Sequence, residues 1–197
     1  MRTHEGQAKP LSQQEFNSVI ECVRRVSTTS YRDIAILQMS FRAGLRAKEI
    51  AELKLSDVID GNGAIKRTVT LRKAATKGGK GGVAFLSHQE LRDALEAYIV
   101  LNRSKISTEY ENVFISRKGT PFSPSSMSRL FGHIYARAGL EGCSSHTGRR
   151  SLAKILNAEN VSVYNIQKIL RHSNIQTTVT HYLSVDEDKL AEIVERT

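Results

Sequence analysis

Six side chains in this sequence are of types that can act on a phosphate group: two arginines, two histidines, a lysine and a tyrosine. They are Arg46, Lys77, His146, Arg149, His172 and Tyr182. The planar guanidinium of arginine binds phosphate oxygens through two parallel hydrogen bonds. Histidine and lysine exchange protons, and a tyrosine phenol becomes a nucleophile once a base removes its proton. Each residue alone also has an ordinary structural explanation, so the interpretation depends on their order and surroundings.

The spacing of these residues places several of them on predicted elements. His146 and Arg149 are three residues apart, so they face the same side of any helix that runs through both. Lys77 opens a glycine-rich turn over residues 77–82 (KGGKGG), which lacks the pattern of a phosphate-binding P-loop. Arg46 follows a Gly-Leu pair, at which a helix is expected to be interrupted. The elements that carry these residues are therefore expected to be helices and one small hairpin.

Hydrophobic periodicity predicts a mainly α-helical chain with a small antiparallel β-hairpin insert, an α+β fold. Helices are expected over 31–43, 46–53, 146–157, 163–171 and 176–182, with others that begin at Ser12, Ser87 and near Pro124 and a last one that carries Leu190, Ile193 and Val194. Strands are expected over 66–71 and 83–86, and 113–115 is a short strand or a buried link. Capping boxes open two of the helices, Ser12 with Glu15 and Ser87 with Glu90.

Composition limits the function less strongly, but it favours a polyanionic partner. The 197 residues carry a formal net charge of +9, and lysine and arginine gain affinity for nucleic acid by releasing counterions from phosphates. The lack of tryptophan and of an aromatic stripe favours duplex DNA over a single strand. No apolar run approaches the roughly 20 residues that span a bilayer, and the first residues do not form a secretory signal. Cys22 and Cys143 are expected to be reduced thiols and are too few for a metal cluster.

Four segments, in this order, resemble the sequence boxes of the tyrosine recombinase, or phage integrase, family. They are residues 41–55 (FRAGLRAKEIAELKL), 76–86 (TKGGKGGVAFL), 146–149 (HTGR) and 170–182 (LRHSNIQTTVTHY). The resemblance extends from about Leu11 to Leu190, and it implies the fold of the tyrosine-recombinase catalytic domain. It also implies that the catalytic residues are Arg46, Lys77, His146, Arg149, His172 and Tyr182, with Glu49 in support of Arg46.

The resemblance implies a site-specific recombinase that cleaves and rejoins DNA strands through a 3′-phosphotyrosyl intermediate, with no metal, cofactor or ATP. Arg46 and Arg149 would stabilise the negative charge that develops on the phosphate in the transition state. His146 would take the proton of the attacking phenol, and Lys77 would protonate the leaving 5′ oxygen. His172 would donate a hydrogen bond to the phosphate.

The last box departs from the family pattern in two ways. Arg171 stands where the family usually has glycine, and this change should alter the turn or add a phosphate contact. Tyr182 lies ten residues after His172, whereas the spacing of nine that many members have would fall on His181. Tyr182 remains the expected nucleophile because the sequence has no other tyrosine after Tyr164.

Further DNA contacts are expected from Lys80, Arg150 and Arg171. Lys80 also lies close enough to Lys77 to compete for the role of general acid, and the sequence leaves that choice open. Double-stranded DNA is the expected partner, bound by a homotetramer, with an accessory DNA-bending protein or a second recombinase as a further partner. The expected location is the cytoplasm, in association with the nucleoid and without a membrane partner.

The resemblance predicts one catalytic domain over residues 1–197, without an N-terminal core-binding domain, as in the short fimbrial phase-switch invertases. Residues 1–10 are expected to be flexible, and a C-terminal helix within 185–197 to pack on a neighbouring protomer. The sequence leaves open whether the chain is a short recombinase or a fragment, and whether it integrates, excises, inverts or resolves DNA. Two other function classes remain: a DNA-binding module without catalysis, and a topoisomerase that relaxes DNA at any sequence.

Overall fold

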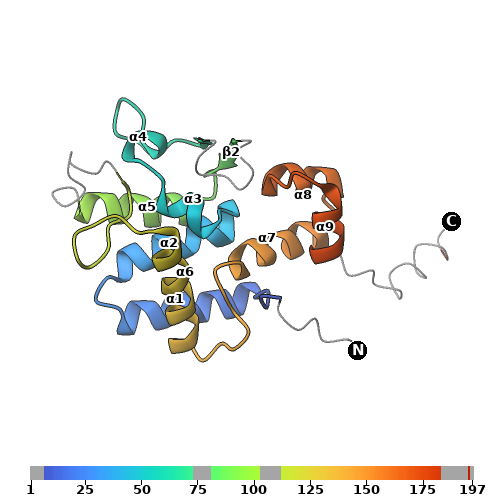
Figure 1. Cartoon of the computed structure of the whole chain (residues 1–197), viewed down its shortest axis with the longest axis horizontal. Coiled ribbons are helices and arrows are strands. Elements are labelled where there is room, and N and C mark those ends of the chain that lie inside the picture. The colour runs from blue at the N-terminus through green and yellow to red at the C-terminus, as the bar shows by residue number, and fades with distance from the viewer. Residues whose placement is uncertain (1–6, 73–80, 103–111, 183–194, 196–197) are drawn as a thin grey trace.

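The chain folds into a mainly helical structure with one small antiparallel sheet (Figure 1). The computed structural model describes residues 7–72, 81–102, 112–182 and 195, with all side chains except those of residues 177 and 180–182. The elements are α1 (Gln13–Val26), α2 (Ser30–Ala43), α3 (Ala47–Ala51), α4 (Leu55–Val58), β1 (Thr68–Leu71), β2 (Gly82–Phe85), α5 (Gln89–Leu101), α6 (Pro124–Arg137), α7 (Thr147–Ala158), α8 (Val163–Leu170) and α9 (Ile175–Tyr182). The predicted fold class is confirmed.

Helices α1 and α2 contribute the N-terminal part of the hydrophobic core. The capping box predicted at Ser12 is present, since its hydroxyl accepts a hydrogen bond from the Glu15 N–H (3.1 Å) and the Glu15 carboxylate accepts one from the Ser12 N–H (2.8 Å). Phe16 on the buried face of α1 stacks on Phe41 of α2, with ring centroids 3.8 Å apart. Helix α2 then ends at Gly44, whose left-handed backbone (φ 60°) turns the chain towards α3.

Strands β1 and β2 pair in an antiparallel register in which Val69 lies opposite Ala84 and Leu71 lies opposite Gly82. The side chains of Val69, Leu71 and Ala84 are buried in the core. Val83 and Phe85 alternate with them on β2 and are exposed on the other face. The predicted alternation along 66–71 is therefore confirmed, and it leaves one face of the sheet free to line a surface pocket.

The beginning of α5 differs from the prediction. Ser87 and Glu90 form no capping box, because α5 starts at Gln89 and its N-cap, His88, makes no side-chain hydrogen bond at the cap. The Glu90 carboxylate instead pairs with Arg42 of α2, with Oε2 2.7 Å from Nη2. A contact between two helices thus determines where the Glu90 side chain lies, and spacing along the sequence does not reveal it.

Helices α7, α8 and α9 gather at one end of the molecule, with β2 next to α8 (Figure 1). Gly148 brings α7 very close to α2: a Cβ atom at this position would lie 2.6 Å from Ser40 Oγ and 2.9 Å from the backbone nitrogen of Phe41. Helix α8 packs on α7 through a small apolar cluster that contains Ile166 and Leu170. This packing brings the end of α8 up to the junction between α2 and α3.

The two ends of the chain are described only in part. Lys9 contacts the rest of the protein, because its N–H donates to the Gly142 carbonyl oxygen at 2.8 Å and its Nζ lies 2.8 Å from Glu15 Oε1. Residues 1–6 of the segment expected to be flexible lie outside the described residues, as does the expected C-terminal helix apart from Glu195. Among the described helices, none has the length and apolar character needed to cross a membrane.

Candidate active site

Arg46 lies where α2 ends and α3 begins. It is the N-cap of α3, and its backbone N–H donates to Glu49 Oε2 at 2.8 Å. Its Nη1 donates to the other carboxylate oxygen, Oε1, at 2.7 Å. The Arg46 side chain keeps 21% of its surface exposed, whereas the Glu49 side chain is completely buried. Glu49 therefore fixes the direction of a guanidinium that still reaches the surface.

The charge of Glu49 is stabilised by three arginines from three parts of the chain. Burial opposes ionisation and raises the pKa of the Glu49 carboxyl. The charge of Arg171, the backbone N–H of Arg46, and the charges of Arg46 and Arg149 act in the opposite direction and together outweigh burial. The pKa of Glu49 therefore lies below its ordinary value, and the carboxylate stays ionised at neutral pH.

Arg149 extends from the first turn of α7 into the interior, and only 1% of its surface is exposed. Its Nη1 donates to the carbonyl oxygen of Gly44 at 2.5 Å, and its Nη2 donates to the carbonyl oxygen of Leu170. These acceptors lie at the ends of α2 and α8, where backbone carbonyls lack partners within their own helix. Arg149 thus joins the ends of two helices, one of them two residues before Arg46 in the sequence.

His172 lies two residues after the end of α8, and 8% of its surface is exposed. Its backbone N–H donates to the Gln167 carbonyl oxygen at 3.0 Å. Its ring nitrogen Nδ1 lies 2.8 Å from the hydroxyl of Thr178, a buried residue of α9. Thr178 therefore orients the imidazole, and the sequence offered no signal for this role beyond the presence of a helix.

Arg171 has a left-handed backbone (φ 54°) and forms the C-cap of α8. Its Nη2 donates to Glu49 Oε2 and to the Gly44 carbonyl oxygen, each at 3.0 Å, and its Nη1 donates to the Ile169 carbonyl oxygen at 2.9 Å. The turn after α8 thus keeps the left-handed conformation that glycine would adopt freely. The guanidinium that replaces glycine is bound to groups of the protein itself.

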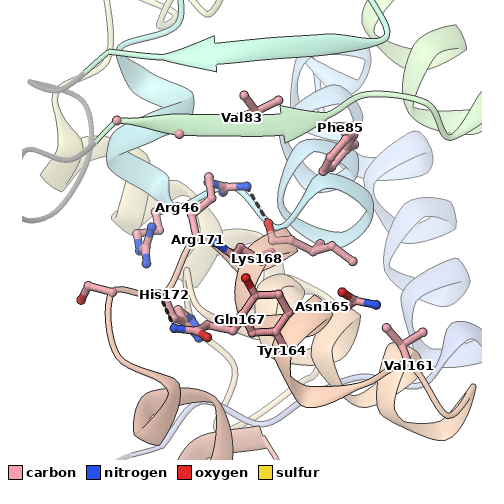
Figure 2. A pocket seen from close by; sticks show the side chains of 14 residues that line it. Arg46, Val83, Phe85, Val161, Tyr164, Asn165, Gln167, Lys168, Arg171 and His172 are labelled. Atoms are coloured by element: carbon pink, nitrogen blue, oxygen red, sulfur yellow. Dashed lines mark hydrogen bonds between the residues drawn. The ribbon is translucent and has the colours of Figure 1, made fainter.

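Arg46, Arg171 and His172 line one pocket of about 860 Å³ between β2 and α8. Figure 2 shows these three residues beneath β2, with Tyr164 of α8 beside them. The exposed face of β2 contributes Val83 and Phe85, so the wall combines cationic and apolar groups. The remaining lining residues are Gly81, Gly82, Val161, Asn165, Gln167, Lys168, Ile169 and Ser173. A pocket with this lining can hold an anionic group next to an apolar one.

Other predicted site residues do not line this pocket among the residues that the structure describes. His146 precedes α7 as its N-cap and is exposed, whereas Arg149 lies in the first turn of α7 and is buried. Arg150 is half-buried in the first turn of α7. Lys77 and Lys80 lie outside the described residues, and Tyr182 is the last residue of α9, with a side chain that is not described.

The described residues hold no group of three or more histidine, cysteine, aspartate or glutamate side chains that could bind a metal ion. Cys22 and Cys143 are both free thiols. Among the described residues that line the pocket, the cationic side chains are Arg46, Lys168 and Arg171.

The chain is thus a helical domain with a pocket in which arginines lie beside an imidazole, where Arg46 is paired with an ionised carboxylate and the imidazole is held by a hydroxyl. Residues 9–189 match the profile of the phage integrase family, and the chain belongs to that family. Its fold is that of the tyrosine-recombinase catalytic domain. This likeness confirms the family resemblance seen in the sequence.

Several curated proteins are similar to the chain. Transposase A from transposon Tn554 of Staphylococcus aureus is 28% identical, over 96% of this chain and 52% of the transposase. Tyrosine recombinase XerC of Myxococcus xanthus is 28% identical, over 95% of this chain and 61% of its own length. XerC of Lactobacillus leichmannii is 26% identical, over 84% of this chain and 55% of its own length. The chain thus spans between about half and three fifths of the length of these relatives.

Solved structures give the same result for the fold. The crystal structure of XerA recombinase superposes with a TM-score of 0.75 and 25% identity, and the match covers 96% of this chain and 65% of XerA. XerH site-specific recombinase, solved with its difH substrate in a pre-cleavage complex, gives a TM-score of 0.74 with 21% identity, over 98% of this chain and 55% of XerH.

Proposed function

We propose that this chain is the catalytic domain of a site-specific DNA recombinase that cleaves and rejoins strands through a phosphotyrosyl intermediate. One observation carries the proposal: Arg46 and His172 line the same pocket, Arg149 binds the ends of α2 and α8 beside it, and the Glu49 carboxylate keeps Arg46 in place. The family of the chain and the names of its relatives, a transposase and XerC recombinases, support the same activity.

In the proposed reaction the Tyr182 oxygen attacks the scissile phosphorus and the bond from phosphorus to the 5′ oxygen breaks. His146 accepts the phenol proton, and Lys77 supplies a proton to the leaving 5′ oxygen. The products are a 3′-phosphotyrosyl bond and a free 5′ hydroxyl. Because the new phosphodiester retains the energy of the old one, attack by another 5′ hydroxyl rejoins DNA without ATP, and the step needs no metal.

Two arginines, one at the surface of the pocket and one buried, stabilise the negative charge that develops on the phosphate. Arg46 has part of its guanidinium at the pocket surface and contacts the phosphate as it enters. Arg149 is held behind it by the carbonyl oxygens of Gly44 and Leu170, so its turn towards the phosphate accompanies DNA binding. The His172 ring donates to the phosphate from Nε2, while Thr178 holds Nδ1.

The proposal extends to the partners and surroundings of the chain. Double-stranded DNA is the substrate, and the net charge of +9 suits binding to its backbone. The active assembly is a homotetramer on DNA, in which a helix within 185–197 packs on the neighbouring protomer, and an accessory DNA-bending protein or a second recombinase can assist it. Such an enzyme acts in the cytoplasm, on the nucleoid.

Trapping of the covalent complex tests the nucleophile. We expect the wild-type chain, incubated with sheared genomic DNA of its host, to form an adduct that survives a denaturing gel, and Tyr182→Phe to form none. Tyr164→Phe is the matched control, because Tyr164 is an exposed tyrosine that lines the pocket of Arg46 and His172, and we expect its variant to keep the adduct. An adduct with Tyr182→Phe refutes the assignment. Relaxation of supercoiled DNA at any sequence would instead indicate a topoisomerase. If the wild type forms no adduct, the chain is a DNA-binding module.

A modified substrate tests the general acid. Sulfur in place of the scissile 5′ bridging oxygen is a good leaving group that needs no proton. We expect Lys77→Ala to cleave this substrate nearly as well as the wild type and the ordinary substrate poorly, with Lys80→Ala unaffected on both. If the sulfur substrate rescues Lys80→Ala and not Lys77→Ala, Lys80 is the acid.

A further inference from the structure

Arg171 occupies a backbone conformation that most side chains avoid. Its φ of +54° lies in the left-handed region, where a Cβ atom is crowded and glycine is not. Among the described residues other than glycine, Asn160 is the only other one with a positive φ, at +58°. Asparagine tolerates this region well because its short polar side chain bonds locally to the backbone, whereas arginine lacks such a short side chain. The contacts of the Arg171 side chain must therefore offset the strain of its backbone.

The aliphatic part of Arg171 packs against the sheet. A Cβ atom added to Gly82 of β2 would lie only 2.8 Å from Arg171 Cδ and 3.2 Å from Cγ, so the close approach depends on the bare glycine. Gly82 is the first residue of β2 and lies opposite Leu71 at the end of β1. Arg171 thus joins the turn after α8 to the end of the sheet that Leu71 and Gly82 form.

The guanidinium of Arg171 is linked to the guanidinium of Arg46 through the Glu49 carboxylate. Glu49 Oε2 accepts hydrogen bonds from Arg171 Nη2 and from the Arg46 backbone N–H, while Oε1 accepts from Arg46 Nη1. Two arginines from distant parts of the chain therefore fix both oxygens of one carboxylate. Without Arg171, one oxygen would lose its charged donor and the carboxylate could rotate about its last bond.

Arg171 is poorly placed to touch DNA itself. Its side chain is only 6% exposed, and both of its Nη atoms donate to groups of the protein. Its Nε is buried and has no hydrogen-bond partner among the described residues, so a phosphate could not reach it without opening the pocket wall. The earlier expectation of a direct phosphate contact for Arg171 therefore has little support from this geometry.

We propose that Arg171 is a positioning residue, which holds Glu49, and through it Arg46, in the phosphate-binding arrangement and ties that arrangement to the base of the β1–β2 sheet. This inference rests on the proposed recombinase function for its effect on cleavage. The link from Arg171 to Arg46 does not depend on that function and can be measured in the protein without DNA.

Arg171→Gly is the central variant, because it removes the side chain and relieves the left-handed backbone at the same time. Asn160→Gly is the matched control, since it makes the same change at the other described non-glycine residue with positive φ. Arg171→Lys keeps a positive charge but lacks the planar fork that spans two acceptors. Glu49→Gln, alone and combined with Arg171→Gly, tests whether the two residues act through one another.

The first measurement is single-turnover cleavage of the duplex recovered from the wild-type covalent complex. At saturating DNA we expect Arg171→Gly to cleave about 10–100-fold more slowly, less than the loss of a direct phosphate donor, with its Kd for DNA within about threefold of the wild type. Arg171→Lys should recover part of the rate. Arg171→Gly should slow Glu49→Gln little further, and Asn160→Gly should match the wild type. A weaker Kd with normal cleavage at saturation would show a direct DNA contact and overturn the proposal.

The second measurement uses the DNA-free protein, labelled with ¹⁵N-arginine. We expect the Nε–Hε signal of Arg46, identified by its absence in Arg46→Lys, to shift or broaden in Arg171→Gly and to stay unchanged in Asn160→Gly. An unchanged Arg46 signal in Arg171→Gly overturns the positioning role, even where the wild type forms its adduct. A changed signal in a protein that forms no adduct would sink the proposed recombinase function and leave the link between Arg171 and Arg46 standing.

Discussion

Replacing Glu49 with glutamine removes one negative charge from the pocket and changes the shape of the side chain very little. The carboxylate accepts hydrogen bonds from Arg46 Nη1 (2.7 Å), the Arg46 N–H (2.8 Å) and Arg171 Nη2 (3.0 Å), and it is fully buried. An uncharged amide cannot balance the two guanidinium groups, and its NH₂ group points a donor at one of them.

The loss of stability in Glu49→Gln depends on how far water can solvate the arginines that lose their carboxylate partner. Arg46 is 21% exposed and can gain solvent, but Arg171 is 6% exposed and remains an uncompensated buried cation. Removal of one partner of a buried ion pair costs about 3–5 kcal/mol. The lower end applies here because Arg46 can gain water, and because Arg149 and Arg171 keep their hydrogen bonds to backbone carbonyl oxygens. For a domain of this size each kcal/mol shifts the melting temperature by about 2–4 °C, so we expect a loss of about 6–12 °C.

Calorimetry of the DNA-free protein measures this loss directly. The matched control is Glu90→Gln, which breaks the Arg42–Glu90 pair of 2.7 Å, where the Glu90 side chain is 56% exposed. That pair should contribute less than about 1 kcal/mol. Adding Arg171→Gly to Glu49→Gln should recover part of the stability, because it removes the stranded charge. If Glu49→Gln melts within the range of Glu90→Gln, the carboxylate does not hold the arginines together and the reasoning fails.

Three further predictions concern pH, packing and DNA affinity. Because the pKa of Glu49 is lower in the folded chain than its ordinary value of 4.5, the stability it provides is present above that value and is lost as the pH falls through the folded-state pKa. The free energy of unfolding, measured with urea, should therefore fall more steeply towards acid pH in the wild type than in Glu49→Gln. Parallel plots of that free energy against pH for the two proteins would contradict this. Gly148→Ala should lower the free energy of unfolding by about 1–3 kcal/mol, since the new Cβ would meet Ser40 and Phe41. The control Gly132→Ala, in α6, meets nothing within 4 Å and should be neutral or stabilising. Equal urea midpoints for the two variants would refute the close packing. Five or six phosphate contacts should give a slope near about −5 for log K against log salt, so filter binding should weaken roughly a thousandfold between about 50 and 200 mM salt, and salt-insensitive binding by the monomer would indicate base readout instead.

Short-range relations in the sequence predicted the features that depend on neighbouring residues. The box of Ser12 and Glu15 begins α1, and the alternation of Val69 and Leu71 marks the buried face of β1. Helix α4 escaped prediction because its four residues are too few to show a period. The box expected at Ser87 was wrong because its acidic partner binds an arginine of another helix.

At the candidate site, too, contacts between neighbouring residues were predictable from the sequence and contacts between distant residues were not. Arg46 and Glu49 are three residues apart, and their pairing follows from that spacing. The contacts of Arg149 with Gly44 and of Arg171 with Glu49 join residues 105 and 122 positions apart, which no local pattern encodes. The family resemblance named Arg149 as a reactive group, but only the packing of α7 on α2 shows that it is buried behind the pocket.

The end of α2 contributes to the electrostatics of the pocket in a way that a count of charged residues misses. Arg149 and Arg171 both donate to the carbonyl oxygen of Gly44, at the C-terminal end of this 14-residue helix. The aligned peptide dipoles of a helix place about half a negative charge at that end. Three guanidinium groups against one carboxylate leave a formal surplus of two positive charges, and the helix end reduces it to about one and a half. Peptide dipoles carry no titratable proton, so this part of the compensation holds at every pH at which the chain is folded, and a second acidic side chain that would repel a phosphate is not needed.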